Sequence, residues 1–198
     1  MADDPSHFER TDVALAAPDL LDRAAEVALE LAADRSWSQI ALRDIARAAG
    51  VSLVELYARA PSKGALLDRL SIRLDALAIE ASEGEDAPDP HDRLFEAAMA
   101  RLEAMQSRRA VLIAIGRAEG LIAMAPRLAR TARALLEAAG IDTSGPQGRL
   151  RVAGMTAVWA RTLQVWRDDE GALNRTMAEI DRRLKQMREQ LGRIGAGF

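Results

Sequence analysis

The chain has 198 residues and a formal net charge of −3, which argues against nucleic-acid binding by its whole surface. Hydrophobic residues make up 49% of it, a share that excludes a disordered chain, and the lack of cysteine excludes disulfides and thiolate metal sites. Alanine is abundant and only 4% of the residues are aromatic, so the composition favours helices over strands. We therefore expect an all-α protein. We expect it in the cytoplasm, because no segment resembles a signal peptide or a membrane span.

The first 83 residues are predicted to form a frayed arm, residues 1–17, followed by four helices. Gly50 is typical of the position just past a helix end, and Ser52 is typical of an N-cap. The predicted helices cover about residues 20–33, 41–49, 53–59 and 62–82.

A short linker with the sequence GEDAPDP, residues 84–90, follows the fourth helix. We expect it to divide the chain into two domains, residues 1–83 and 84–198. The second domain contains no alternating pattern that requires a strand. Its predicted helices cover about residues 91–106, 107–120, 126–139, 147–167 and 171–192.

The segment from Leu42 to Leu67 has the pattern of a helix-turn-helix. Two short helices meet at a Gly-Val-Ser turn, residues 50–52, and small or branched apolar residues such as Ile45 and Leu56 face each other across the corner. In proteins with this motif the second helix enters the major groove of DNA. The segment therefore predicts a DNA-reading surface.

Residues 20–70 together resemble the N-terminal domain of the TetR family of transcriptional regulators. The resemblance rests on Trp37, Arg43-Asp44-Ile45-Ala46, Gly50-Val51-Ser52, Leu56-Tyr57, Ser62-Lys63 and Leu66-Leu67 in that order. It implies a TetR-like all-α homodimer with a helix-turn-helix head and a C-terminal bundle that binds a small ligand. The function that it implies is ligand-responsive regulation of transcription through operator DNA.

Seven residues are predicted at the DNA surface, with Ser52, Leu53 and Glu55 nearest the bases and the basic residues and tyrosine on phosphates. They are Arg43, Ser52, Leu53, Glu55, Tyr57, Arg59 and Lys63. The second helix departs from the family pattern, because Leu53 and Val54 are bulky and apolar and Glu55 is acidic. A carboxylate repels phosphates, although it can accept a hydrogen bond from cytosine. The alternative is a helix-turn-helix that is kept as a fold and binds DNA weakly or not at all.

Residues 151–186 resemble the C-terminal part of the accessory proteins of coenzyme Q biosynthesis. The resemblance rests on Val165-Trp166-Arg167-Asp168-Asp169 and Ile180-Asp181-Arg182-Arg183-Leu184. It implies a TetR-like fold that binds an isoprenoid lipid, which is the alternative function. No separate amphipathic helix follows the last predicted helix, so we expect no stable membrane insertion.

Methionine and other large apolar residues of the second domain are typical of an adaptable apolar pocket, with Arg161 and Gln164 as a candidate polar end. The predicted ligand is a hydrophobic small molecule or lipid, such as a fatty acyl or isoprenoid chain. For each of these residues taken singly, an ordinary core is the better explanation, and only the set as a whole suggests a pocket. The candidate lining is Phe95, Met99, Leu102, Met105, Ile113, Met124, Met155 and Trp159.

The last predicted helix carries a seam with the 3.5-residue period of helices that pack along one another. The spacing fits packing within one subunit and packing between subunits, and the family resemblance favours a dimer interface. The candidate interface residues are Leu163, Trp166, Met177, Ile180, Leu184 and Met187.

No pattern of catalytic or metal-binding residues is present, so we expect no enzyme activity, cofactor or metal. The two histidines, His7 and His91, have no partner at ligand spacing and are expected in solvent. Residues 168–170, Asp-Asp-Glu, are expected to form a solvated helix end.

Overall fold

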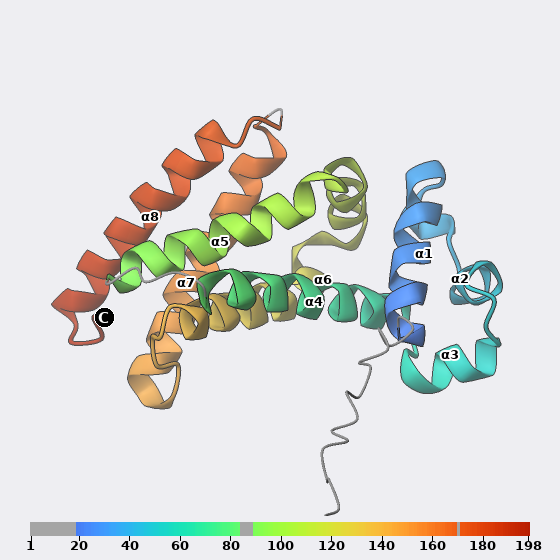
Figure 1. Cartoon of the computed structure of the whole chain (residues 1–198), viewed down its shortest axis with the longest axis horizontal. Coiled ribbons are helices and arrows are strands. Elements are labelled where there is room, and N and C mark those ends of the chain that lie inside the picture. The colour runs from blue at the N-terminus through green and yellow to red at the C-terminus, as the bar shows by residue number, and fades with distance from the viewer. Residues whose placement is uncertain (1–18, 84–88, 170) are drawn as a thin grey trace, which may run out of the picture.

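The computed structural model describes residues 19–83, 89–169 and 171–198, and within them it is all-helical, as predicted (Figure 1). The predicted arm, His7, Glu170 and most of the linker lie outside these residues. The elements are α1 Leu20–Asp34, the 3-10 helix η1 Trp37–Gln39, α2 Leu42–Ala48, α3 Leu53–Arg59, α4 Lys63–Glu83, α5 Pro90–Gln106, α6 Arg109–Ala138, α7 Gly145–Arg167 and α8 Asn174–Arg193.

Two hydrophobic clusters hold the chain together. One lies within what we call the head, α1–α3 and the first half of α4, and the other within the bundle, α5–α8 and the second half of α4. Figure 1 shows the head at one end of the molecule, with α4 running from it into the bundle. Leu74 of α4 and Leu112 of α6 pack against both clusters. The two parts of the chain are therefore joined by shared apolar contacts and not by a linker alone.

Helix α6 takes part in both clusters, which the sequence did not suggest. Ile115, only 4% exposed, belongs to the core of the head, together with residues of α1–α4. Leu135 and Leu136, further along the same helix, are fully buried in the core of the bundle. The head is thus completed by a helix that lies more than 25 residues beyond the predicted domain boundary.

The predicted break between two helices is confirmed at Gly120, whereas the predicted non-helical stretch from there to Pro126 is wrong. Only Gly120 leaves the helical conformation, with φ 75° and ψ 170°, and the chain then continues as helix through Pro126. Pro126 removes one hydrogen bond to the carbonyl of Ile122. Because Ile122 is 94% exposed, water can reach that part of the backbone, so the proline is tolerated. The result is one kinked helix with its corner at a glycine.

Two acidic or basic groups that were expected in solvent are buried. Asp169 is 5% exposed, and its carboxylate accepts hydrogen bonds from the backbone N–H and the hydroxyl of Thr176, at 2.8 and 2.6 Å. It therefore holds the start of α8, while Asp168 beside it is exposed as predicted. His91 is 8% exposed because it begins α5 against α8, where its Nε2 lies 3.7 Å from Asp181.

No helix in the described ranges is both long and apolar enough to cross a membrane.

Candidate functional site

The helix-turn-helix has the local geometry that its sequence predicts. Gly50 adopts φ 68°, a left-handed conformation that a side chain disfavours, and Val51 N–H then donates to the carbonyl of Ala46 at 3.0 Å. The Ser52 hydroxyl accepts from the N–H of Glu55 at 3.1 Å and so caps α3. These contacts fix the direction in which α3 leaves the turn.

Helix α3 buries one side and leaves the rest in solvent. Leu56 is fully buried in the head and Leu53 is half-buried against the same cluster. Val54 is 81% exposed and Tyr57 is 59% exposed. Glu55 and Arg59 are exposed too, as are Ser52 at the cap of α3 and Arg43 on α2. Six of the seven predicted DNA residues thus lie on or beside α2 and α3 with side chains that are at least partly exposed to solvent. Leu53 is the least exposed of the six.

Lys63 has a different environment from the other predicted DNA residues. Its Nζ donates a hydrogen bond to the carbonyl of Trp37 and lies 4.5 Å from the centre of the Trp37 ring. Burial lowers the pKa of Lys63, and the nearby Glu119 carboxylate opposes that shift. The hydrogen bond of this ammonium therefore ties α4 to η1 within the head. It uses one of the three N–H donors of Lys63.

A cavity of about 410 Å³ lies where α4, α5, α6 and α7 meet. Four of the eight predicted pocket residues line it: Met105, Ile113, Met124 and Trp159. The other four do not, because Met99, Leu102 and Met155 are buried in the bundle core and Phe95 packs on the outside of that core. Gln164 lines the cavity as the predicted polar end, and Arg161 does not.

The kink of α6 shapes the cavity. Gly116 and Gly120 both line it, with Leu121 and Met124 just beyond the corner. The sulfur of Met124 would lie 3.5 Å from a Cβ at position 116, which is an ordinary van der Waals distance. The two arms of the kinked helix therefore approach each other closely here, and the approach does not depend on a glycine at position 116.

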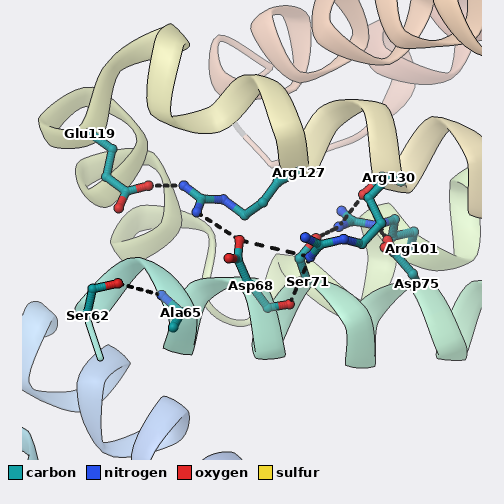
Figure 2. Close-up of polar contacts among 10 residues, drawn as sticks. Ser62, Ala65, Asp68, Ser71, Asp75, Arg101, Glu119, Arg127 and Arg130 are labelled. Carbon is teal, nitrogen blue, oxygen red and sulfur yellow. Dashed lines mark hydrogen bonds and ion pairs between the residues drawn. The ribbon is translucent and has the colours of Figure 1, made fainter. Parts of the chain in front are cut away.

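One wall of the cavity carries a buried ion pair, Arg101 of α5 with Asp75 of α4 (Figure 2). Arg101 Nε donates to Asp75 Oδ1 at 2.7 Å, and its Nη2 donates to the hydroxyls of Ser71 and Thr131, both at 3.1 Å. The Arg101 guanidinium also lies 5.1 Å from the ring centre of Trp159. Burial lowers the pKa of Arg101, and the Asp75 carboxylate opposes that shift. A buried, partnered charge on a cavity wall marks a candidate site.

A second polar contact joins the corner of α6 to α4. Arg127, after the kink, binds Glu119, before it, and also Asp68 of α4 at 3.2 Å, as Figure 2 shows. Arg127 and Glu119 both line the cavity. The corner of α6 is thereby held to the helix that leads into the head.

Comparison with known proteins identifies the head. Residues 25–70 match the family model described as bacterial regulatory proteins, tetR family. The head is a tetR-family domain.

The fold of the whole chain agrees with this assignment. A TetR transcriptional regulator from Nitrosomonas europaea ATCC 19718 is 27% identical, with a TM-score of 0.65 over 85% of this chain and 97% of that one. A TetR transcriptional regulator from Rhodococcus sp. RHA1 is 20% identical, with a TM-score of 0.63 over 83% and 93%. No curated protein matches the chain. The predicted TetR-like fold is confirmed, and the resemblance of residues 151–186 to coenzyme Q accessory proteins stays a prediction.

The TetR-like bundle buries most of the predicted dimer residues within one chain. Ile180 and Leu184 are fully buried and Met187 is 4% exposed, so none of the three has surface left for a partner. The seam of α8 therefore packs on its own subunit, and its placement in a dimer interface is corrected. The remaining candidates are Leu163 and Trp166, which line the cavity, and Met177, which is 40% exposed.

The Asp75–Arg101 pair was missed in the sequence, although one signal for it was present. Along α4 the buried positions run Leu67, Ser71, Asp75, Ala78 and Ser82, at the spacing of one helix face. Polar residues at three positions of a core-facing stripe break the expected pattern. Such an interruption indicates that the polar residues of α4 have buried polar partners. It does not identify the residues of other helices that are those partners.

Proposed function

We propose that this protein is a transcriptional regulator that binds operator DNA as a homodimer in the cytoplasm and responds to a hydrophobic ligand. In this proposal residues 1–83 form the DNA-binding head and residues 84–198 form the ligand-binding and dimerisation domain. The two hydrophobic clusters support the division, with the addition that α6 also packs on the head.

The observation that carries the proposal is the exposed α3 on a tetR-family head. Its cap and turn are formed by Ser52 and Gly50, and its outer residues have no contact within the core. An isolated hydrophobic side chain such as Val54, 81% exposed, is ordinary on a surface. Arg59 at the end of α3 forms an exposed ion pair with Asp19 at 3.6 Å, and Val54, Glu55 and Tyr57 lie in solvent. A short capped helix with an exposed outer side is the form in which helix-turn-helix proteins present side chains to the major groove.

The cavity supports the response to a ligand. Its volume of about 410 Å³ lies within the range of small-molecule sites, and its apolar residues favour a hydrophobic ligand. Helices α4 and α6 line it and also pack on the head. A ligand that fits one arrangement of these helices better than another shifts the head between positions.

The homodimer is supported by exposed apolar residues on α7 and α8. Leu150 is 46% exposed, Met177 is 40% exposed and Ile194, which follows α8, is 62% exposed. Two heads in one dimer can bind two half-sites one helical turn apart. Light scattering at micromolar concentration tests this part, and a monomer contradicts it.

The surface of α3 favours one alternative function, a lipid-binding protein whose head binds DNA weakly. Glu55 places a carboxylate, and Val54 an apolar group, where phosphate donors would strengthen binding. Residues 36–63 contain four basic and two acidic residues, which is a smaller excess of positive charge than DNA-binding domains usually carry. In this alternative the cavity holds an isoprenoid chain and the head serves only as a fold.

Selection from a random-site DNA pool, followed by fluorescence anisotropy at low and moderate salt, separates the two functions. Enrichment of a palindrome supports the regulator. Weak binding that disappears at moderate salt, with no enriched site, supports the alternative.

Two arginine variants test whether α3 contacts the DNA. Arg59→Ala should weaken binding to every sequence and lower the salt slope by about one unit. Arg193→Ala, which removes another exposed arginine at the C-terminal end of α8, serves as the matched control and should leave both quantities unchanged. Equal losses in the two variants mean that α3 is not the DNA surface.

A further inference from the structure

The charged groups around the cavity compensate one another. Among the described residues four arginines line it, and three of these are paired with carboxylates: Arg101 with Asp75, Arg127 with Glu119 and Asp68, and Arg167 with Asp168. The fourth, Arg117, is exposed to solvent. The interior of the cavity therefore presents no uncompensated positive charge, and it does not favour an anionic ligand.

Arg101 nevertheless has donor capacity to spare. Its Nε and Nη2 donate to oxygen atoms, whereas the one acceptor of its Nη1 among residues 19–83, 89–169 and 171–198 is the sulfur of Met105, at 3.0 Å. A thioether is a weak acceptor, and Nη1 carries two N–H groups. Arg101 and Met105 both line the cavity, in a wall that is otherwise largely apolar. A buried charged donor in this position gains most from an additional oxygen acceptor.

The hydrogen bonding of Asp75 indicates which kind of ligand oxygen can accept a hydrogen bond from Arg101. Its Oδ1 accepts from Arg101 and Thr131, but its Oδ2 is buried and finds no donor in the described part of the chain. The carboxylate therefore depends on the charge of Arg101. A second carboxylate on Arg101 would share that charge and repel Asp75 in a site of low dielectric. A neutral oxygen takes the hydrogen bond without this cost.

We infer that the cavity binds a neutral, largely apolar molecule whose carbonyl oxygen accepts a hydrogen bond from Arg101 Nη1. The inference rests on the proposed ligand site and adds the charge and the polar group of the ligand. Hydrocarbon contacts with residues such as Met124 and Trp159 supply the affinity, and Arg101 supplies the selectivity.

Three small probes with one bicyclic ring system test the inference: 1-tetralone with a carbonyl, tetralin without a polar group, and tetralin-1-carboxylate with a negative charge. Calorimetric titration of the full chain measures a Kd for each. We expect the ketone to bind about 10- to 100-fold more tightly than tetralin, which is the range for one hydrogen bond to a charged donor. We expect the carboxylate to bind more weakly than the ketone.

Variants then assign the preference to Arg101. Removing Arg101 alone would leave the buried Asp75 with Thr131 but without a charged partner, so the double variant Arg101→Met/Asp75→Leu is the appropriate one, because apolar replacement of a buried pair is commonly tolerated. In this variant the ratio of the two Kd values should fall to about one, which means that the preference for tetralone over tetralin is lost. Arg117→Met, which removes the exposed lining arginine, is the matched control and should keep the preference.

Each other outcome overturns the inference in a recognisable way. Equal affinity for the ketone and tetralin leaves an apolar ligand site without the hydrogen bond. Tighter binding of the carboxylate means an anionic ligand. If Arg117→Met loses the preference for tetralone, the carbonyl oxygen of the ligand binds to Arg117 at the mouth of the cavity instead of to Arg101. If no probe binds, the ligand site of the proposed function fails as well, whereas the DNA selection experiment still tests the head on its own.

Discussion

Truncating Ile115 tests whether α6 holds the head together. Ile115 lies on the arm of α6 before the kink, is 4% exposed, and packs into the cluster formed by α1–α4. Replacing a fully buried isoleucine by alanine in a protein core costs about 2–5 kcal/mol. Domain stabilities are about 5–15 kcal/mol, so Ile115→Ala should remove a large share of the stability of the head.

Urea unfolding followed by circular dichroism measures the loss. With a slope of about 2–3 kcal/mol/M, a loss of about 3 kcal/mol lowers the midpoint by about 1 M or more. Ile122→Ala is the matched control, because Ile122 lies on the same helix and is 94% exposed, and it should change stability by no more than about 0.5 kcal/mol. If the two variants shift the midpoint equally, α6 does not complete the core of the head.

Two further predictions concern the bundle. Gly148→Ala should destabilise the chain by about 1–3 kcal/mol, because a Cβ at position 148 would lie 2.1 Å from a backbone carbon of the preceding loop. Gly192→Ala is the control: its Cβ would meet nothing within 4 Å, and it should stabilise the chain by up to about 1 kcal/mol. Thermal unfolding compares the two variants, and a stabilising Gly148→Ala would contradict the structure. The pKa of Glu179 is about 2 instead of 4.5, because hydrogen bonds from Arg182 and Arg183 outweigh its desolvation. Since this folded-state pKa is depressed, the stabilisation is present above about pH 4.5 and is lost as the pH falls towards 2. Glu179→Gln should therefore flatten the dependence of the urea midpoint on pH in that window, and an unchanged dependence would remove Glu179 as its source.

The sequence predicted most of the helices because their ends depend on local signals. The limits of α3, residues 53–59, follow from a serine cap before it and from Pro61 after it, because a proline favours an extended conformation at the preceding residue, here Ala60. Gly120 likewise carries a local signal, and the chain bends there. Pro126 misled the prediction, because the cost of a proline depends on whether water reaches the carbonyl that loses its partner, which is a tertiary property.

The candidate site was predicted only in part, because its polar members come from different helices. Asp75 and Arg101 are 26 residues apart, and only the packing of α4 on α5 brings them together. Met105 and Met155 look alike in the sequence, yet one lines the cavity and the other is fully buried in the core. The period of the α8 seam fits packing within and between subunits equally, so burial alone places Leu184 inside its own chain.

The position of the kink explains why one cavity can serve both parts of the molecule. Before Gly120, α6 packs on the head through Ile115 and on both clusters through Leu112, and after Gly120 the same helix packs in the bundle. Glu119 and Arg127, on the two sides of the corner, bind each other, and Arg127 also binds Asp68 of α4. A ligand beside this corner contacts both arms of α6, so its binding free energy depends on the angle between them. In the proposed function, a change in that angle shifts Ile115 in the core of the head and so couples occupancy of the cavity to the position of α3 through one helix.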